Sequence, residues 1–427
     1  MQTVLRCIDC GKSYPSDQAF VTCPACGGLL DVEHDLDALR GAVSHELFDQ
    51  RLGSWDRLDR SGVWRYRELV LPDLPAETYV TRGEGNTTLY DATPRLGDYA
   101  GVRKLQLKHE GENPTGSFKD RGMAGGVTQA RRVGAHSVIC ASTGNTSASM
   151  ASYAAISGLQ ALVLFPEGYV SLGKIAQSVA YGATNVQVHG DFDDTLAIVR
   201  AAAESLPVYL LNSINPFRLE GQKTIIIEML HQRGWRVPDW IVVPGGNLGN
   251  SSAFGKALME LKTLGLIDRM PRLAIVQAEG ANPLYRSFVD GSATLTPVKA
   301  QTIATAIRIG NPASFAKAWR TLEWTDGVVT EVSDQAIMDA KAQVDAAGIG
   351  CEPASAASVA GVRRLVDEGV IAPGDEVVGI LTGHVLKDPD AVLKYHSKAL
   401  DGLTSTFANT MHTIPASLDA LKALIPA

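Results

Sequence analysis

A single lysine in the stretch GENPTGSFKDRG, residues 111–122, stands in a setting that can make it reactive. The residues before it, NPTGS (113–117), favour a tight turn, and Thr115 or Ser117 can cap the helix that follows. Lys119 then falls in the first turn of that helix, where the helix dipole and nearby cations oppose protonation of an amine. A partly neutral lysine can form a Schiff base, whereas the alternative is an ordinary surface lysine after a loop.

The elements that must position this lysine follow from the pattern of the chain beyond residue 100, where short apolar runs alternate with amphipathic ones. This alternation predicts an α/β fold with parallel sheets that helices cover on both faces. The predicted strands are KLQLKHE (104–110), SVICAS (137–142), ALVLFP (161–166), NVQVHG (185–190), VYLLNS (208–213), WIVVPGG (240–246), RLAIVQAE (272–279) and EVVGILTG (376–383). The predicted helices include TSASMASYAAISG, LGKIAQSVAYG, DDTLAIVRAAAES, SAFGKALMELKTLG and SDQAIMDAKAQVDAAG. Ligands of such folds bind beyond the carboxyl ends of the strands.

Two of these strands are followed by groups that suit an anion. The first ends in STGNTSAS (142–149), which offers more small donors than a helix cap needs: Ser142, Thr143, Asn145, Thr146 and Ser147. The second ends in GGNLGNSSAFGKAL, where Gly245, Gly246 and Gly249 let backbone amides surround a phosphate. This turn is neither a Walker loop nor a GxGxxG dinucleotide turn.

Further candidates follow other strands or begin helices. Thr382 sits at a strand end, Arg218 lies in NSINPFRLEGQKT and Asn311 lies in AIRIGNP. Glu352 precedes a run of small residues in CEPASAASVAG. That run indicates close helix packing, or a buried carboxylate at the mouth of a site.

Four of the six cysteines form two CxxC pairs near the start of the chain: Cys7, Cys10, Cys23 and Cys26. Gly11 and Gly27 follow the pairs and let the backbone amides turn toward the sulfurs. We interpret the segment as a zinc ribbon, with a redox pair or an empty ribbon as the alternatives. Four thiolates fill a tetrahedron, so such a zinc would be structural. Cys140 and Cys351 are predicted to be buried or to line a site.

Composition places the chain among ordinary globular proteins. It has 427 residues, 45% hydrophobic and 20% charged, with a formal net charge of −7. The acidic balance argues against binding of a nucleic-acid backbone as the main role. The sequence shows neither a secretory signal nor an apolar run long enough to span a bilayer, so the cytoplasm is the expected location.

The chain divides into a ribbon and two larger parts. We predict a zinc ribbon at 1–30, the first part of a large domain at 31–105, a small α/β domain with the Schiff-base lysine at 106–215, and the rest of the large domain at 216–427. Residues 63–75 are expected to be extended, and the Ala/Leu-rich tail from about 400 to 427 is expected to form a packed terminal helix.

Eight stretches together resemble the fold type II family of pyridoxal-phosphate enzymes and, within it, the threonine synthases. They are NPTGSFKDRG, ASTGNTSAS, FPEGYVSLGKIAQ, NSINPFRLEGQKT, PGGNLGN, TAIRIGNP, CEPASAASVAG and LTGHVLKDP. They follow the family's order over most of the chain. The resemblance implies two open, twisted, mostly parallel sheets with flanking helices, as in the β subunit of tryptophan synthase. It also implies pyridoxal 5'-phosphate as cofactor.

The resemblance implies a role for each matching residue. Lys119 would hold the cofactor as a Schiff base with Phe118 beside the ring, while Asn145 and Thr382 would face the ring hydroxyl and the ring nitrogen. The loop that holds the cofactor phosphate would be Gly245, Gly246, Asn247, Leu248, Gly249 and Asn250. The phosphate of the substrate would meet Thr143, Thr146, Ser213 and Arg218. Lys174 could add a charge there or be a surface lysine.

The implied activity is conversion of O-phospho-L-homoserine and water to L-threonine and phosphate, by γ-elimination and then β-addition of water. The alternatives within the family are a phosphoserine-using β-replacement enzyme such as cysteate synthase and, less favoured, a serine or threonine dehydratase. A zinc-ribbon nucleic-acid or protein-binding module on an inactive enzyme fold is the alternative from another class, and the intact Lys119, Asn145 and Thr382 argue against it. The expected partners are a phosphorylated amino acid and a second copy in a homodimer, with neither nucleic acid nor membrane.

Overall fold

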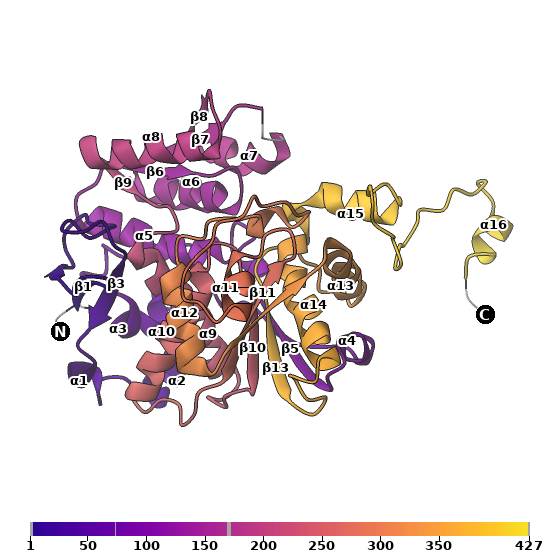
Figure 1. The fold of residues 1–427 in the computed structure, drawn as a ribbon, viewed down its shortest axis with the longest axis horizontal. Coiled ribbons are helices and arrows are strands. Elements are labelled where there is room, and N and C mark those ends of the chain that lie inside the picture. Colours follow the sequence, from indigo (N-terminus) through magenta and orange to yellow (C-terminus); the bar gives the residue numbers. More distant parts are fainter. Residues whose placement is uncertain (1–2, 73, 169–171, 426–427) are drawn as a thin grey trace.

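Three sheets organise the chain in the computed structural model, which describes residues 3–72, 74–168 and 172–425 (Figure 1). The largest has six strands in the order β12-β11-β10-β13-β5-β4. Their bounds are Leu89–Asp91 (β4), Lys104–His109 (β5), Trp240–Pro244 (β10), Arg272–Ala278 (β11), Val328–Val332 (β12) and Glu376–Leu381 (β13). All neighbours run parallel except β4, which is antiparallel to β5. The segments that follow β5, β10 and β13 therefore meet at one edge.

A smaller parallel sheet has the order β8-β7-β6-β9. Its strands are Ser137–Ala141 (β6), Gln160–Pro166 (β7), Thr184–Val188 (β8) and Val208–Leu210 (β9). All eight strands predicted from the sequence are present, and the α/β fold class with two mostly parallel sheets is confirmed. The sequence analysis missed β4 and β12.

Helices cover both faces of the large sheet, as the period-2 alternation of its strands requires. Ile241 and Val243 face a core shared with α9, α10 and α12, whereas Trp240 and Val242 face a core shared with α4, α13 and α14. The α-helices are Leu36–Leu39 (α1), His45–Leu52 (α2), Arg67–Val70 (α3), Pro94–Ala100 (α4), Lys119–Arg132 (α5), Asn145–Ser157 (α6), Leu172–Ala180 (α7), Phe192–Ser205 (α8), Pro216–Gln232 (α9), Gly249–Thr263 (α10), Pro283–Val289 (α11), Phe315–Thr325 (α12), Asp334–Ala346 (α13), Pro353–Asp367 (α14), Pro389–His396 (α15) and Leu418–Lys422 (α16). Short 3-10 helices are Trp64–Tyr66 (η1), Glu110–Glu112 (η2), Thr305–Ile307 (η3) and Val385–Lys387 (η4). None of the described helices is both long and apolar enough to cross a membrane.

The prediction of an extended segment at 63–75 is wrong, because η1 and α3 occupy residues 64–70. This segment passes between two cores. Tyr66 and Leu69 pack into one core, and Trp64 and Val70 pack into the other. Burial on two sides removes the single apolar stripe by which a helix is recognised in a sequence.

The cysteine-containing segment forms a three-stranded antiparallel sheet, in the order β2-β1-β3. Its strands are Thr3–Cys7 (β1), Ser13–Pro15 (β2) and Leu30–His34 (β3). The sheet thus continues four residues beyond the boundary expected at residue 30.

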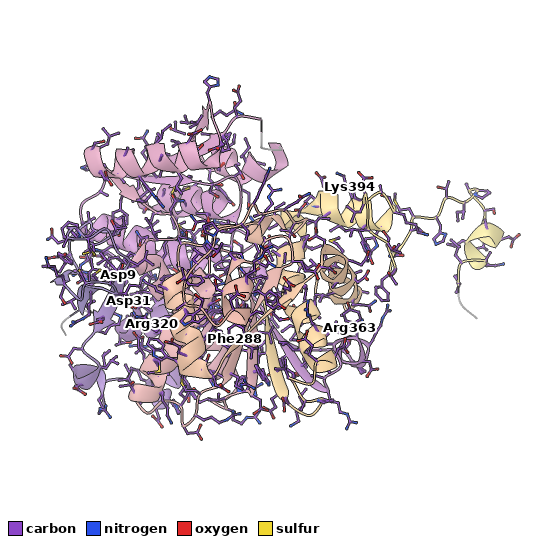
Figure 2. All side chains as sticks on the ribbon, in the orientation of Figure 1. Asp9, Asp31, Phe288, Arg320, Arg363 and Lys394 are labelled. Atoms are coloured by element: carbon purple, nitrogen blue, oxygen red, sulfur yellow. The ribbon has the colours of Figure 1, made fainter. Side chains whose placement is uncertain are left out.

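Strand β3 is tied to the large domain by buried charges (Figure 2). The Nζ atom of Lys317 donates to the carbonyl oxygen of Leu30 at 2.7 Å and pairs with an oxygen of Asp31 at 2.8 Å. Arg320 reaches the other oxygen of Asp31 at 2.7 Å, and the two side chains lie side by side. On the same strand, Nε2 of His34 lies 2.9 Å from Oε2 of Glu220 on α9. Ion pairs this deep need their partners, because burial of an unpaired charge is costly.

The prediction of a packed terminal helix at 400–427 is wrong. Phe407 still packs beside α13, but the following residues run away from the body and end in the short helix α16 (Figure 1). Leu418 and Leu421 are exposed there. Residues 404–417, TSTFANTMHTIPAS, are rich in Thr, Ser, Asn and Pro, which are poor helix formers, so they interrupt the helix that the Ala/Leu content suggested.

Candidate active site

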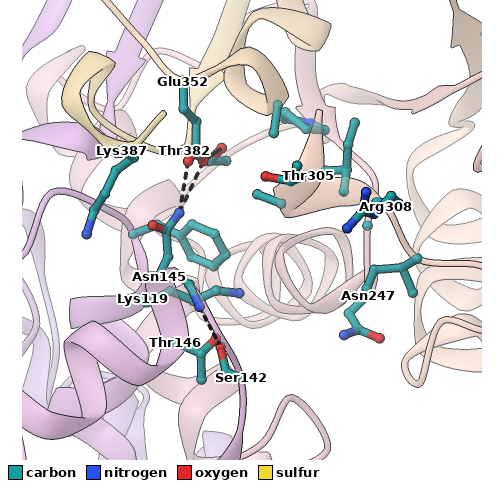
Figure 3. Close-up of a pocket in the computed structure, with 18 of the residues that line it drawn as sticks. Lys119, Ser142, Asn145, Thr146, Asn247, Thr305, Arg308, Glu352, Thr382 and Lys387 are labelled. Carbon is teal, nitrogen blue, oxygen red and sulfur yellow. Dashed lines mark hydrogen bonds between the residues drawn. The ribbon is translucent and has the colours of Figure 1, made fainter. Parts of the chain in front are cut away.

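A cavity of about 1330 Å³ lies beyond the carboxyl ends of the strands and is lined by segments from both parallel sheets (Figure 3). Predicted cofactor residues in its lining are Phe118, Lys119, Asn145, Gly246, Asn247, Leu248, Gly249, Asn250 and Thr382. Predicted substrate-phosphate residues in its lining are Thr143, Thr146, Ser213 and Arg218. The lining of the cavity includes residues from all eight of the stretches that carry the resemblance.

Lys119 is the first residue of α5 and follows a tight turn, as the sequence predicts. The helix cap differs from the prediction, because neither Thr115 nor Ser117 caps α5. Instead, the backbone N–H and the hydroxyl of Thr115 donate to the carboxylate of Asp120, each at 2.6 Å. Ser149 donates to the same carboxylate at 2.5 Å. Asp120 therefore holds the turn from inside the helix and fixes the position from which Lys119 projects.

Arg121, the arginine of the KDRG motif, anchors α5 through buried ion pairs. Arg121 is fully buried, and its guanidinium donates to Glu110 at 2.7 Å and to Glu228 at 2.7 Å. Lys108 on β5 also pairs with Glu228, at 2.6 Å. This network joins β5, α5 and α9 near the start of the helix that carries Lys119.

The side chain of Lys119 is half-buried in the wall of the cavity, and desolvation there holds the pKa of its amine at about 7, far below the usual value for lysine. Burial is the main cause, the positive charge of Arg218 lowers the pKa further, and Glu352 opposes both. Desolvation favours the neutral amine. A substantial fraction of Lys119 is therefore neutral at neutral pH, as a nucleophile requires.

Schiff-base formation with added pyridoxal phosphate should follow this pKa. We expect the rate of formation in the cofactor-free protein to rise with pH and to reach half its maximum near pH 7, because the protonated amine cannot attack. Arg218→Met removes a neighbouring cation and should move the midpoint upward. The appearance of the Schiff-base absorption band after rapid mixing measures this rate. A midpoint near 10.4, the ordinary value for lysine, would contradict the prediction.

The loop between β10 and α10 has the properties of a phosphate cradle. Among the described residues, none accepts a hydrogen bond from the backbone N–H groups of residues 246–250. Leu248 has φ of 64°, which turns these groups at the start of α10. A Cβ at Gly246 would lie 3.1 Å from Cα of Ile307, so glycine lets η3 pack closely on the loop. Free N–H groups at the positive end of a helix dipole fit a phosphate.

The prediction for Gly245 differs from the structure. Its backbone N–H was predicted to bind the phosphate, but that N–H donates to the carbonyl oxygen of Val276 at 2.7 Å. A Cβ there would lie 2.6 Å from Cγ2 of Ile275. Gly245 thus serves the packing of β10 on β11, and the cradle begins at Gly246.

Arg218 supplies a second place for an anion. Its side chain is buried and Nη1 donates to the carbonyl oxygen of Leu211 at 3.0 Å, whereas Nε and Nη2 have no partner among the described residues. Burial lowers its pKa to about 10, and the Cys140 sulfur opposes that shift. A buried guanidinium with two free donors and no paired carboxylate fits an anionic ligand.

The structure gives no support for two further candidates from the sequence, Asn311 and Lys174. Asn311 is exposed and lies outside the lining of the cavity. The side chain of Lys174 lies outside the described part of the structure, as do residues 169–171 of the FPEGYVSLGKIAQ motif.

Glu352 contacts two residues that are expected to face the cofactor ring, Asn145 and Thr382. Its carboxylate accepts from Nδ2 of Asn145 at 3.0 and 3.3 Å, and its Oε1 lies 3.5 Å from the hydroxyl of Thr382 (Figure 3). Burial raises the pKa of Glu352, and the hydrogen bond from Asn145 opposes that shift. Thr382 is held in turn by the hydroxyl of Ser355 at 2.9 Å. Ser355 lies in a run of small residues, and nothing in the sequence distinguished it from its neighbours.

Other cavity residues were missed by the sequence analysis. Gln222 lies one helical turn after Arg218 and lines the cavity, and its Oε1 has no partner within the part of the chain that the structure describes. Asn212 also lines the cavity, and its amide joins the ends of β6 and β9 by bonding both backbone groups of Ala141 at 3.0 and 3.2 Å. Neither residue stood in a pattern that required a polar side chain.

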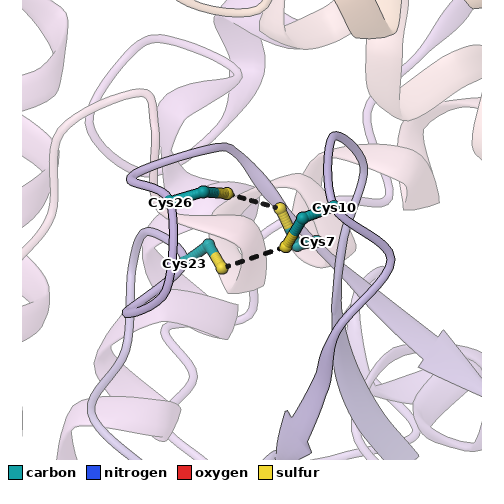
Figure 4. A group of neighbouring side chains, drawn as sticks. All are labelled: Cys7, Cys10, Cys23 and Cys26. Carbon is teal, nitrogen blue, oxygen red and sulfur yellow. Dashed lines mark hydrogen bonds between the residues drawn. The ribbon is translucent and has the colours of Figure 1, made fainter.

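The four ribbon cysteines lie together (Figure 4). The sulfurs of Cys7 and Cys26 are 3.5 Å apart, and those of Cys10 and Cys23 are 3.7 Å apart. A disulfide would need about 2.05 Å, whereas the edge of a tetrahedron around zinc with Zn–S bonds of about 2.3 Å is roughly 3.8 Å. After each pair, a glycine with positive φ, Gly11 or Gly27, closes the turn. The donor set and its spacing fit a zinc ion.

A second cluster of potential metal ligands, His34, Glu220 and Glu260, is already occupied by cations. The Nζ atom of Lys223 lies 2.6 Å from Glu220 and 2.5 Å from Glu260, and Lys256 contacts both carboxylates. These ammonium groups neutralise the carboxylates, so the cluster is an ion-pair network and not a metal site.

Comparisons with known proteins identify the family of the chain. A family profile described as "Pyridoxal-phosphate dependent enzyme" matches residues 80–383. The threonine synthase of Methanocaldococcus jannaschii is 47% identical over 91% of this chain and 94% of its own. The chloroplastic threonine synthase 2 of Arabidopsis thaliana is 39% identical over 96% of this chain and 82% of its own. The crystal structure of Escherichia coli threonine synthase shares the fold, with a TM-score of 0.70, 18% identity and 99% of both chains covered. The chain therefore belongs to the pyridoxal-phosphate-dependent enzymes and, within them, to the threonine synthases.

Proposed function

We propose that the protein converts O-phospho-L-homoserine and water to L-threonine and phosphate. The observation that carries this proposal is the presence of two separate anion sites in one cavity, the 246–250 loop and Arg218. A cofactor phosphate would occupy one such site, which leaves the other for a phosphate on the substrate. A dehydratase acting on serine or threonine would have no use for the second site.

The residues of the cavity fit pyridoxal phosphate. Lys119 can hold it as a Schiff base, the free N–H groups of 246–250 can bind its phosphate, and Asn145 and Thr382 can face its ring. The bound cofactor supplies an electron sink for negative charge at the α carbon of the substrate. A hydroxyl at Thr382, in place of a carboxylate, does not require a protonated ring nitrogen.

The chain itself supplies proton transfer and binding of the leaving group. The Lys119 amine, with its pKa near 7, can take a proton from one substrate carbon and return it to another. Arg218 stabilises the negative charge of the phosphate as it leaves, because its free donors are already in place. Thr143, Thr146 and Ser213 line the same cavity and offer hydroxyl donors. Glu352 holds Asn145 in position.

The proposal is tested with the purified, cofactor-loaded protein and O-phospho-L-homoserine. Phosphate and threonine should appear in equal amounts. O-Phospho-L-serine with sulfite is the matched comparison, since a β-replacement enzyme would release phosphate from that pair instead. Phosphate release from phosphoserine but not from phosphohomoserine would overturn the proposal while leaving the family assignment intact.

We also infer that the ribbon binds one structural zinc. We expect one equivalent of zinc per chain, and we expect Cys10→Ser with Cys26→Ser to remove it, because a tetrahedral site does not survive the loss of two ligands. Metal analysis and thermal unfolding measure the result, which should be a lower melting temperature with the cofactor content initially unchanged. Full stability in protein purified without zinc would contradict the inference.

We propose a homodimer, supported by the exposed apolar side chains of the tail, such as Leu418 and Leu421, and sedimentation equilibrium tests it. We propose the cytoplasm as its compartment, supported by cysteines that are all unpaired. The division at residues 30, 105 and 215 also remains a proposal, and limited proteolysis tests it.

A further inference from the structure

The turn before Lys119 is held by a segment from the other side of the cavity, the residues that follow β13. The carbonyl oxygen of Gly116 accepts from the N–H of His384 at 2.9 Å, and the N–H of Phe118 donates to the carbonyl oxygen of Thr382 at 3.0 Å. The turn and the start of η4 thus lie against each other. This contact brings η4 to the edge of the cavity.

Lys387, the last residue of η4, lies across this turn. Its Cε is 2.9 Å from the place where a Cβ on Gly116 would lie. Gly116 has φ of 86°, so a glycine here serves both the turn and the passage of the lysine. Figure 3 shows Lys387 at the edge of the cavity with its side chain directed away from Glu352 and Thr382. The lysine therefore points toward the small sheet and away from the expected position of the cofactor ring.

The amine of Lys387 forms a hydrogen bond with the side chain of Gln177. Its Nζ donates to Oε1 of Gln177, and Nε2 of Gln177 donates to the carbonyl oxygen of Thr115 at 3.3 Å. One amide thus bonds both η4 and the Lys119 turn. All three residues line the cavity.

This contact joins the two halves of the cavity. Gln177 lies on α7, which connects β7 and β8 of the small sheet, whereas Lys387 follows β13 of the large sheet. Asn145 and Glu352 form another contact across the cavity, but Asn145 is expected to bind the cofactor. The Lys387–Gln177 contact uses neither an expected cofactor residue nor an expected substrate residue, so it can persist when both ligands are bound.

We propose that Lys387 and Gln177 are positioning residues that clasp α7 to the Lys119 turn and keep the cavity intact between loss of phosphate and addition of water. The proposal rests on the proposed function, in which the unsaturated product of phosphate loss must remain bound until water adds at the β carbon. If that product escapes, its C–N bond is hydrolysed in solution. The balance is then O-phospho-L-homoserine and water to 2-oxobutanoate, ammonia and phosphate. The two routes consume the same water and release the same phosphate, and they differ in the organic product.

The test compares Lys387→Met, Gln177→Leu and the double variant with the cofactor-loaded wild-type protein. Methionine keeps an unbranched side chain over Gly116 and removes the charge. Each single variant should lower kcat for threonine about tenfold and raise the ratio of 2-oxobutanoate to threonine. The double variant should be no worse than either single one, because both remove the same contact. Lys387→Arg should restore much of the product ratio.

The matched control is Lys394→Met, an exposed lysine seven residues further along, on α15 (Figure 2). It should behave as wild type. Losses that multiply in the double variant, or a rise in KM alone with an unchanged product ratio, would overturn the proposal and indicate that Lys387 binds substrate directly.

Hydrogen exchange provides a readout that needs no substrate. Amides of α7 from residue 175 to 180 should exchange about tenfold faster in Lys387→Met than in wild type or in Lys394→Met. Unchanged exchange would overturn the clasp even if threonine is formed. If the wild-type protein forms no threonine but exchange in α7 accelerates as expected, the clasp stands and the proposed function fails.

Discussion

Lys119→Ala is expected to abolish threonine formation, with a loss of about 10⁴-fold, the upper range for one acid–base group. The same side chain is the expected Schiff-base nucleophile and is the titratable group whose pKa of about 7 suits proton transfer between carbons. Its position on α5 is held by Asp120 and Arg121, and α5 contains no second lysine. Parallel assays of phosphate and threonine measure the loss.

The control for this variant is Lys262→Ala, which removes an exposed lysine at the end of α10. Lys119→Ala should keep the fold and should lose the absorption band of the Schiff base while still binding pyridoxal phosphate through the 246–250 loop. Retention of more than a hundredth of the wild-type turnover would show that another group performs the proton transfers.

Arg218→Met is expected to have opposite effects on activity and on stability. The value of kcat/KM should fall about 10³-fold, because truncation of a buried, hydrogen-bonded charge pair costs about 2–5 kcal/mol. In phosphate-free buffer, however, the free energy of unfolding should rise by about 1–3 kcal/mol, because the variant no longer buries a guanidinium with two free donors. A gain in stability with a loss of activity is the trade-off expected of a residue that serves the active site at a cost to the fold.

Thermal unfolding with and without inorganic phosphate measures the stability effect. Phosphate should stabilise the wild-type protein more than Arg218→Met, because a ligand stabilises the state that binds it. Arg131→Met, which removes an exposed arginine of α5, is the control and should change neither quantity. A lower stability of Arg218→Met in phosphate-free buffer would show that Arg218 supports the fold and not an anion.

The parallel strands could be predicted from the sequence because their apolar runs are continuous and their ends carry marked residues. WIVVPGG and EVVGILTG are buried on both faces and end in glycine or threonine. In contrast, β4 has three residues and stands at the edge of its sheet, so it has no apolar run of its own. The 64–70 helices were mistaken for an extended segment because their apolar residues serve two cores.

The site could be predicted as a set of motifs, but its internal contacts could not. Thr115 or Ser117 was predicted to cap α5, whereas the carboxylate of Asp120 holds the turn by accepting from Thr115. Gly245 stood in a glycine pair that suited phosphate, yet its amide completes the sheet ladder. Both outcomes depend on hydrogen bonds between residues whose approach is set by the tertiary fold, and residue types alone do not specify such pairings.

The attachment of the ribbon has a consequence for the history of the chain. Strand β3 supplies partners to three charges that remain in the large domain, those of Lys317, Arg320 and Glu220. A lineage that deleted the ribbon would remove the Asp31 carboxylate and, with it, the counterion of the Lys317 ammonium. We therefore expect relatives without a ribbon to carry an uncharged residue at the position of Lys317. Loss of the ribbon and replacement of this lysine should have been inherited together.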